Sequence, residues 1–540
     1  MINTIFYSLP ELSPLASPVI QDRRSVLNFA LTCRAFRAPA LNVLYSHLNE
    51  IGPLIKALPD ELVHLREPSP VTPEQFHSLV PYATRVKILS KSYGHDDTAY
   101  ELLVASAPKD TLLFPKLRSL TWWDCCLTSI PALRLFLSTL ESLSLHLSDT
   151  SFLKAIIPDL HITAPYLKAL AFVGFVETTE DSPSEIESLL LSYSEGLTKF
   201  SFTCYDIPSH LLDVIAAWPR LRWLTLELSY ESIPPVPLHI PQPFQALNHL
   251  HISCDDLGLF MSFLRAFRIL RMDSDTCSFG SPNLKTIQIN ALGCSSANIW
   301  SELLILLTRI TLEHIIVTDG CRDQHTELHC HIEVSAFEFC SLLTHPTALV
   351  DLRTLVLSPN HASSIALNNA DILTLARTCP YLEILDLGMS NTSVSLCTLG
   401  VLVRRCRELR KVFLCVDARL DSLAITLPNN DDDNDQVCLQ PNTRLYTLDI
   451  GDSPIACEGP LDPPTAPDLM RSIPRFLHSM APGLQAIVTT SGMGRAGRYK
   501  SECGEYERRW EVVSDALAAM AKDANYKVEG NDMFYFRGLC

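Results

Sequence analysis

The sequence predicts an α/β protein in which a strand and a helix repeat along most of the chain, preceded by a small all-α domain. Three observations predict this fold class. A short apolar pattern with strand alternation recurs along the chain. Stretches with helical spacing lie between its copies. Residues 1–50 carry helical spacing without the strand pattern, so we expect them to form a separate helical domain.

The repeated pattern is Leu-x-x-Leu-x-Leu, with other apolar residues allowed at each site. The second and third sites alternate, so both side chains reach one face of a short strand. The first site fills the same interior from the preceding turn. Successive first sites lie from 23 residues (Leu117 to Leu140) to 40 residues (Leu312 to Leu352) apart, which is one supersecondary unit. Copies begin at Leu117, Leu140, Leu167, Leu197, Leu221, Leu247, Leu284, Leu312, Leu352, Leu382, Leu409, Leu445 and Leu484, with a weaker copy at Val86.

Helical stretches fill the gaps, for example residues 210–218 and 299–310, and we also expect a helix over 335–343. In the clearest unit, residues 370–378 have helical spacing, Cys379-Pro380 ends the helix, and Leu382, Leu385 and Leu387 enter the core. Strand, loop and helix repeated in this way predict a leucine-rich-repeat solenoid, with parallel strands on its concave face and helices on its convex face. The alternative is a non-repeat α/β protein that is rich in leucine.

Composition narrows the functional classes. A chain of 540 residues exceeds one compact core, and 47% hydrophobic with 19% charged residues indicates a folded, soluble protein. The net charge of −17 argues against a general nucleic-acid or anionic-membrane surface. Eighteen cysteines scattered through apolar segments favour reduced thiols. With no signal-peptide pattern and no long apolar run, we expect a cytoplasmic or nuclear protein with no nucleic-acid or membrane partner.

Residues 1–50 predict three short helices. Ile2, Ile5, Phe6 and Leu9 have helical spacing and precede a loop rich in Pro and Ser. Two helical segments follow, residues 26–36 (VLNFALTCRAF) and 39–48 (PALNVLYSHL). We expect Pro39 in the first turn of the second helix, where proline is well tolerated.

This segment resembles the later two-thirds of an F-box. The residues that carry the resemblance are Ile2, Ile5, Phe6, Leu9, Val26, Leu27, Ala30, Leu31, Cys33, Arg34, Phe36, Leu41, Leu44 and Tyr45. Residues 48–62 (LNEIGPLIKALPDEL) are similar to the segment after the F-box in fungal families of F-box and leucine-rich-repeat proteins. The domain typically begins with a Leu-Pro-x-Glu turn before its first helix, whereas this chain starts inside that helix. We therefore expect either an abbreviated F-box or a missing start.

The resemblance implies a noncatalytic protein without cofactors. In such families the F-box binds a Skp-family adaptor, which links it to a cullin-RING ubiquitin ligase, and the repeats hold the target protein. Apolar residues of the helix pair would close a small core, while Phe36 and its neighbours would form a patch for the adaptor and Arg34 would lie at its rim. The implied adaptor-binding residues are Ile5, Phe6, Leu9, Leu31, Cys33, Arg34 and Phe36.

Two alternatives remain open for this region. Cys33 and Phe36 would equally suit packing within the domain. Separately, a shortened F-box would have lost adaptor binding, and the chain would then be a repeat scaffold without ligase coupling. The expected domains are an F-box-like domain at 1–50, a helical or loop linker at 51–80, a leucine-rich-repeat solenoid at 81–492, and a capping helix with a tail at 493–540.

The repeat register also predicts a partner surface, because residues between the buried sites point away from the core. Aromatic side chains are the expected anchors, since they often dominate interface energies. Each of these side chains would alternatively fold under a loop. The partner-binding candidates are Trp123, Trp223, Glu227, His249, His251, Asp386, Lys411 and Phe413, and Ser119, Thr121 and Thr225 share their face.

Four further motifs are interpreted as structural elements and not as catalytic or cofactor sites. Residues 492–497 (GMGRAG) lack a following helix for a dinucleotide site, so we expect a turn. Residues 321–331 (CRDQHTELHCH) hold enough ligands for zinc but no standard spacing, so we expect a solvated loop; an enzyme using this loop is the third and weakest hypothesis. Residues 431–435 (DDDND) indicate a loop. Trp510, Val513, Leu517 and Met520 have helical spacing and predict a helix that covers the open end of the repeats.

Overall fold

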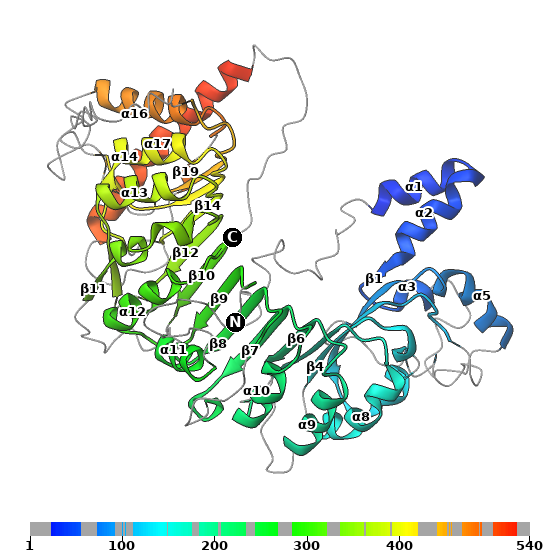
Figure 1. The fold of residues 1–540 in the computed structure, drawn as a ribbon. Helices are drawn as coiled ribbons and strands as arrows, with labels where there is room; N and C mark the ends of the chain where they lie inside the picture. The colour runs from blue at the N-terminus through cyan, green and yellow to red at the C-terminus, as the bar shows by residue number, and fades with distance from the viewer. Residues whose placement is uncertain are drawn as a thin grey trace. The chain divides into compact units, whose positions relative to one another are not determined.

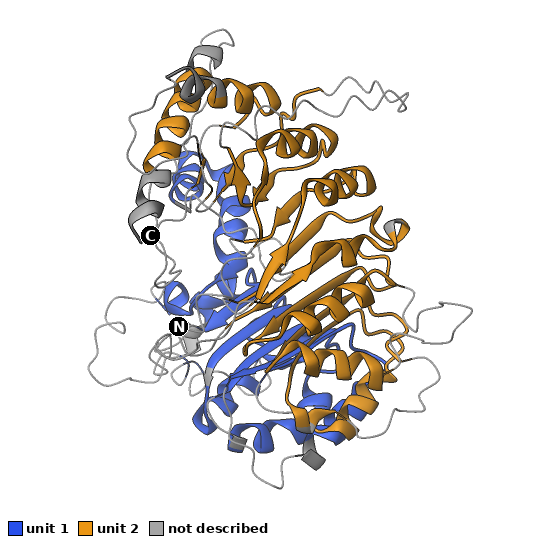
Figure 2. Ribbon diagram, turned by 90° about the vertical axis from the view of Figure 1, so that its left-hand side faces the viewer, with its two compact units in different colours: residues 1–205 blue, residues 206–540 orange. Residues whose placement is uncertain are grey.

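The protein has an α/β fold with a 15-stranded parallel sheet. Its residues fall into two compact units, 1–205 and 206–540 (Figure 2). The computed structural model describes residues 23–55, 73–91, 100, 103, 112–134, 136–147, 150–174, 183–203, 207–233, 243–267, 283–320, 335–360, 363–388, 391–418, 440–450, 453, 455, 467–484, 487–488 and 500–525.

The described part of unit 1 starts with a helix pair and continues as parallel strands whose order follows the chain (Figure 1). Its strands are β1 (His47–Leu48), β2 (Ile88–Lys91), β3 (Ser119–Cys125), β4 (Ser142–Leu147), β5 (Ala169–Gly174) and β6 (Lys199–Thr203). Its helices are α1 (Arg23–Thr32), α2 (Arg34–Ser46), α3 (Gly52–Ile55), α5 (Pro73–Ala83), η2 (Leu127–Ser129), α7 (Ile130–Arg134), η3 (Leu137–Thr139), α8 (Thr150–Thr163) and α9 (Pro183–Ser192).

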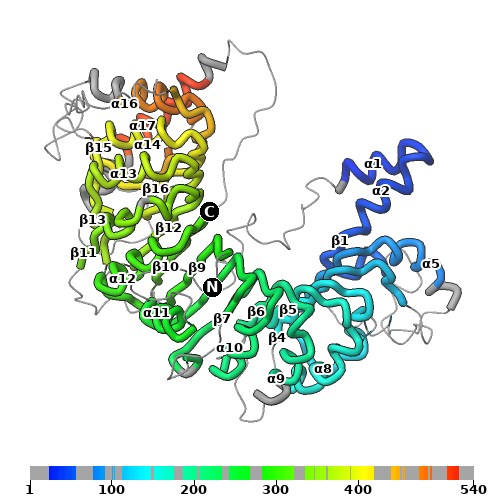
Figure 3. The backbone as a smooth tube through the Cα atoms, viewed as in Figure 1, coloured from blue at the N-terminus to red at the C-terminus, as the bar shows by residue number. Residues whose placement is uncertain are grey.

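Unit 2 repeats the same arrangement, and its helices α10–α14 and α16 lie on one face of its strands (Figure 3). Its strands are β7 (Trp223–Leu228), β8 (His249–Cys254), β9 (Thr286–Ala291), β10 (His314–Asp319), β12 (Thr354–Ser358), β14 (Ile384–Asp386), β16 (Lys411–Phe413), β18 (Thr447–Asp449) and β19 (Ile487–Val488). Its helices are α10 (Ser209–Ala216), η4 (Tyr230–Ser232), α11 (Leu257–Ala266), α12 (Ala297–Leu307), η5 (Phe339–Leu343), η6 (Pro346–Leu349), α13 (Asn369–Thr378), α14 (Leu396–Arg405), α16 (Pro467–Met480) and α17 (Lys500–Asn525).

Two short parallel pairs lie outside the main sheet. Strand β11 (Ser335–Glu338) pairs with β13 (Ser363–Ala366), and β15 (Val394–Ser395) pairs with β17 (Val416–Asp417). These pairs join the ends of neighbouring repeats beyond the strands of the main sheet.

The repeated apolar sites build the core of both units. Leu382, Leu385 and Leu387 are fully buried, and the parallel register places Leu385 beside Leu355 of the preceding strand. The register therefore stacks equivalent sites of successive copies, which confirms the predicted strand positions. This stacking buries one apolar layer between strands and helices, and burial of that area is the main stabilising term.

The weaker copy of the apolar pattern, which begins at Val86, is confirmed as strand β2, although one of its three sites holds a charged residue. Val86 and Leu89 are buried as predicted, but the third site is Lys91, whose side chain is only 1% exposed. Its ammonium lies 5.2 Å from the ring centroid of Trp122 on the next strand. The long aliphatic stem fills the apolar site while the charge contacts an aromatic face.

Side-chain caps fix the helix of the clearest unit. The Asn368 carboxamide accepts a hydrogen bond from the Asp371 backbone nitrogen at 3.0 Å, and the Asp371 carboxylate accepts one from the Asn368 nitrogen at 3.0 Å. This reciprocal pair satisfies two backbone donors at the start of α13. The helix ends at Thr378, directly before Cys379 as expected.

Three expectations about helices are wrong. Helix α1 ends at Thr32 and α2 starts at Arg34, so the predicted helix over 26–36 is divided at Cys33, and Pro39 lies inside α2 and not in its first turn. Residues 335–343 form strand β11 followed by the 3₁₀ helix η5 and not one α-helix. The side chain of Phe337 in β11 is buried and stacks on Trp300 with ring centroids 5.0 Å apart. Pairing with β13 together with this contact favours the extended backbone.

The last helix packs against the last strand of the sheet, as the sequence predicts for a covering element. Trp510, Val513 and Leu517 of α17 are buried, and Met520 is half-buried. The Trp510 indole donates to the Ser453 carbonyl at 2.9 Å, and the Ile487 backbone nitrogen donates to the Ser514 hydroxyl at 3.2 Å. The helix therefore covers the end of the apolar layer and satisfies a backbone donor of β19.

Candidate functional site

The helix pair α1–α2 turns at a single residue. Cys33 has an extended backbone (φ −155°, ψ 159°) and separates the two helices. Its carbonyl accepts a hydrogen bond from the Phe36 nitrogen at 3.2 Å, which starts the second helix. The two helices are therefore joined by a one-residue turn.

The helix pair buries small residues and exposes large ones. Ala30 and Ala40 are buried, whereas several large apolar side chains face outwards. Phe29 and Phe36 stack at a centroid distance of 4.2 Å and an interplanar angle of 23°. The buried side chains of the helix pair are therefore alanines, and these larger side chains are not part of a core. The exposed residues Leu27, Phe29, Leu31, Phe36 and Val43 are called the helix-pair patch below.

Four of the predicted adaptor-binding residues lie on this helix pair. Leu31 is 76% exposed, Phe36 is 43% exposed, and Cys33 and Arg34 are also exposed. Their accessibility favours a surface role for these residues over packing within the domain. The other three, Ile5, Phe6 and Leu9, lie outside the described residues. Exposed apolar area of this kind is typical of an interaction site.

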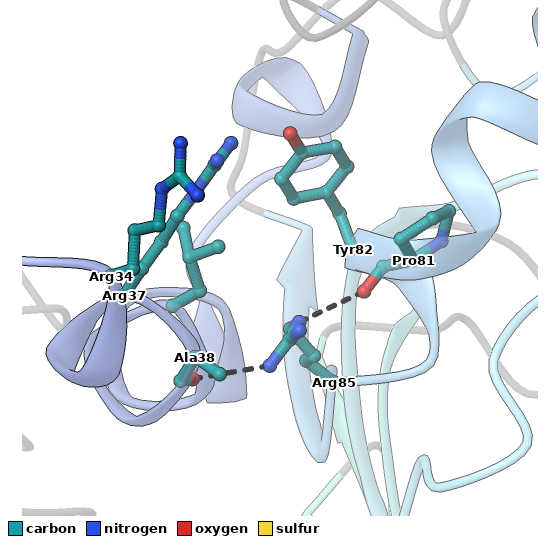
Figure 4. Close-up of a pocket in the computed structure, with 7 residues that line it drawn as sticks. Arg34, Arg37, Ala38, Pro81, Tyr82 and Arg85 are labelled. Atoms are coloured by element: carbon teal, nitrogen blue, oxygen red, sulfur yellow. Dashed lines mark hydrogen bonds between the residues drawn. The ribbon is translucent and has the colours of Figure 1, made fainter. Parts of the chain in front are cut away.

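A hollow lies beside the helix pair, between α2 and α5 (Figure 4). The volume of this hollow is about 290 Å³. Of the residues that line it, only Arg34 was predicted from the sequence as a site residue. Arg37 follows Arg34 by three positions, so the two side chains are neighbours on the surface of a helix. This spacing could have identified Arg37 from the sequence. We call this site the arginine hollow, and its lining residues are Arg34, Arg37, Ala38, Leu41, Pro81, Tyr82 and Arg85.

Arg85 forms the floor of the hollow by joining two helices. Its Nε donates to the Pro81 carbonyl at 2.9 Å and one Nη donates to the Ala38 carbonyl at 3.2 Å (Figure 4). The same Nη also donates to the Asn42 carboxamide oxygen. Because Arg85 follows Arg37 by 48 residues, no local sequence pattern could have joined it to the α2 arginines.

The strand face of unit 1 carries the predicted outward residues. Ser119, Thr121 and Trp123 are half-buried on β3, on the side opposite the buried Leu120 and Trp122. The Trp123 indole stacks on the His146 ring of β4 at 3.5 Å and 13°.

Burial lowers the pKa of His146 to about 4, because the imidazolium form would lose hydration beneath the indole. The stacked pair therefore presents a flat, uncharged aromatic surface at neutral pH.

A second stacked pair begins the strand face of unit 2. The rings of Trp223 on β7 and His249 on β8 stack at 4.5 Å. The Trp223 indole donates to the Thr225 hydroxyl at 3.1 Å, which fixes its orientation. Glu227 is half-buried at the end of the same strand. These residues lie on the predicted face, where the indole is held in one orientation.

A chain of hydrogen bonds crosses the next strands. The Thr318 hydroxyl donates to the Asn290 carboxamide oxygen at 2.9 Å, and the Asn290 amide donates to His251 Nε2 at 2.9 Å. Burial lowers the pKa of His251 to about 4, so its ring is neutral and Nε2 accepts. The sequence analysis missed Asn290 and Thr318, although the repeat register puts both on this face.

The remaining candidates lie on β14 and β16. Register pairs Asp386 with Phe413, and Lys411 with Ile384, and all four side chains are half-buried. Burial raises the pKa of Asp386, while its bond to the Gly388 nitrogen at 3.1 Å and the charge of Lys411 oppose this rise. This end of the strand face is therefore charged and aromatic, whereas the β8–β10 region is polar and neutral.

Several sequence motifs lie outside the described residues, namely the cysteine-histidine stretch 321–331, the acidic run 431–435 and the glycine motif 492–497. Within the described residues, no group of three or more His, Cys, Asp or Glu side chains could hold a metal ion. In the same part of the chain, no helix is both long and apolar enough to cross a membrane.

Comparison with known proteins adds no relative to these observations. No protein-family model matches this chain, and no curated protein matches it.

Proposed function

We propose that this protein is a noncatalytic substrate-recognition subunit of an SCF-type cullin-RING ubiquitin ligase. Its helix pair binds a Skp-family adaptor, and its repeats form a leucine-rich-repeat solenoid whose strand faces bind the target protein. The observation that carries the proposal is the helix-pair patch, which exposes large apolar side chains directly ahead of a parallel repeat sheet.

The composition of the patch suits a protein partner. Phe36 stacks on Phe29, so both rings are held in place before binding and lose little entropy on contact. Leu31, in the last turn of α1, has 76% of its surface exposed. Burial of such rigid apolar groups at the centre of an interface supplies much of its binding energy.

The repeats support the second half of the proposal. One supersecondary unit follows each copy of the apolar pattern, and the copies stack in register. The strand face of unit 2 combines rigid aromatic groups with neutral hydrogen-bonding groups and a few charges. Such a mixture is typical of protein-binding surfaces.

The test is a binding titration of the full chain with a Skp-family adaptor from the same source. We expect Leu31→Glu and Phe36→Ala each to weaken binding by about thirtyfold, the effect of removing an interface anchor of about 2 kcal/mol. Leu127→Glu is the matched control, because Leu127 is 51% exposed in the same unit but lies outside the patch.

Each outcome has a defined meaning. Binding that Leu31→Glu and Phe36→Ala each weaken about thirtyfold, and that Leu127→Glu leaves unchanged, supports the ligase role. Adaptor binding that survives both patch substitutions places the interface elsewhere. Absence of binding by the unaltered chain ends the ligase proposal and leaves the repeat scaffold.

A further inference from the structure

The arginine hollow combines three guanidinium groups at one site. Arg34 and Arg37 extend in the same direction from α2, Tyr82 stands opposite them, and Arg85 lies below (Figure 4). The ring of Tyr82 packs against the ring of Tyr45, with centroids 5.0 Å apart. The hollow therefore has two exposed cationic arms, Arg34 and Arg37, a cationic floor and an aromatic wall.

The two arms lack counter-ions within the described residues. The side chains of Arg34 and Arg37 make no hydrogen bond or ion pair with the described residues, although both line the hollow from the same helix. Several exposed arginines elsewhere in this acidic chain are paired, for example Arg118 with Glu141 at 2.8 Å. Like charges three residues apart on a helix repel each other, so an anion between them would relieve that repulsion.

The floor of the hollow is rigid. Arg85 uses Nε and one Nη to hold Pro81 and Ala38, so its guanidinium is fixed before any ligand arrives. A fixed cation needs no further ordering on binding, which favours affinity. The second Nη of Arg85 makes no hydrogen bond within the described residues, so it retains its donors.

We propose that the arginine hollow binds a phosphate monoester. Guanidinium groups match phosphate oxygens with paired donors, and a dianion with three terminal oxygens suits three such groups better than a single carboxylate does. A volume of about 290 Å³ admits a phosphoryl group together with the side chain that carries it. The inference goes beyond the proposed function, since neither adaptor docking nor target binding through the strand faces requires a phosphate.

The experiment is calorimetric titration of the full chain with three probes at low ionic strength. These are inorganic phosphate, a neutral peptide containing one phosphoserine, and the same peptide without phosphate. We expect the first two to bind and the third not to bind. Arg34→Gln and Arg37→Gln should each weaken phosphate binding about tenfold, the loss of one charge-assisted contact.

Two further variants separate charge from geometry. Arg24→Gln removes an exposed arginine of α1 that does not line the hollow, and it should leave the affinity unchanged. Arg37→Lys keeps the charge but loses the planar pair of donors, so its affinity should fall between those of Arg37 and Arg37→Gln. Because Arg34 and Arg37 make no described contact that stabilises the fold, unchanged unfolding midpoints are expected for these variants.

The source of the phosphate follows from the probes. A phosphopeptide that binds at least about tenfold tighter than inorganic phosphate points to a phosphorylated protein, and equal affinities point to a free phosphate or small phosphate ester. No phosphate binding at about 10 mM, or equal binding by the Arg34→Gln/Arg37→Gln double variant, overturns the proposal.

Discussion

The carboxylate of Asp319 accepts a hydrogen bond of 3.1 Å from the indole nitrogen of Trp300 within the core of unit 2. The same oxygen accepts from the Ser295 backbone nitrogen at 3.1 Å and the Asn360 amide at 2.9 Å. Asp319 is only 4% exposed, and the parallel register pairs it with Ala291. A carboxyl group therefore replaces a small apolar residue and joins a helix, a strand and a loop.

This network predicts a stability that depends on pH. Burial raises the pKa of Asp319 from 3.8 to about 6, because the charged form loses its hydration. Between about pH 4 and pH 6 the folded chain holds a proton that the unfolded chain has lost, so this group's contribution falls as pH rises. We expect the free energy of unfolding to lose about 2 kcal/mol from this source across that range.

Chemical denaturation at a series of pH values checks this expectation, with Asp319→Asn as the test variant. The difference in unfolding free energy between the wild type and Asp319→Asn should change with pH in the stated direction. Asp351→Asn, at an exposed position, should show no such change. A wild-type curve parallel to that of Asp319→Asn would show that Asp319 does not titrate in this range.

The apolar layer gives a second prediction. Leu385 is fully buried on β14, so Leu385→Ala should lower the free energy of unfolding by about 2–5 kcal/mol through the cavity it leaves. Denaturant titration measures the loss. Leu127→Ala, at a half-exposed site, should change the midpoint little, and an unchanged midpoint for Leu385→Ala would remove this residue from the core.

The sequence was sufficient to predict the strands because their signal is local. Leu352, Leu355 and Leu357 lie within six residues and are all fully buried. The same three-site spacing also shows which residues of each strand point away from the core. Trp223 and His251 could therefore be assigned to the strand face from the sequence. Neither assignment requires knowledge of distant parts of the chain.

The errors arise where distant residues decide the local structure. Residues 335–338 become a strand because they pair with 363–366, which no local pattern shows. The arginine hollow was missed for the same reason, since Arg85 meets Arg37 only through the packing of α5 on α2. Asp319 could have been identified from the sequence as an unusual buried residue, because the equivalent positions in other strands hold apolar residues such as Ala291 and Leu228.

The hydrogen-bonded chain on the strand face of unit 2 gives a third prediction. His251 accepts from Asn290, and burial lowers the pKa of His251 to about 4. Its neutral ring contributes stability above its unfolded pKa of about 6.5, and this contribution is lost as pH falls towards 4. Asn290→Asp would place a carboxylate beside the ring, so the pKa of His251 should rise above about 5.

Nuclear magnetic resonance of the full chain with labelled histidine measures this pKa directly. Asn283→Asp adds the same charge at an exposed position and should leave the His251 titration near 4. A wild-type His251 that titrates near its ordinary value of about 6.5 would contradict the burial of its ring.

The contact between α17 and the end of the sheet gives the last prediction. Trp510 is buried and donates to Ser453, and Ser514 of the same helix accepts from the β19 nitrogen of Ile487. Trp510→Ala should lower the free energy of unfolding by about 3–5 kcal/mol and loosen α17 from the strand. Hydrogen exchange should then accelerate at Ile487 and in β18, while β7 and β8 keep their protection. Val512→Ala, on the exposed side of the helix, is the matched control and should leave exchange unchanged. Equal protection of Ile487 in the wild type and in Trp510→Ala would mean that the strand end holds without the helix.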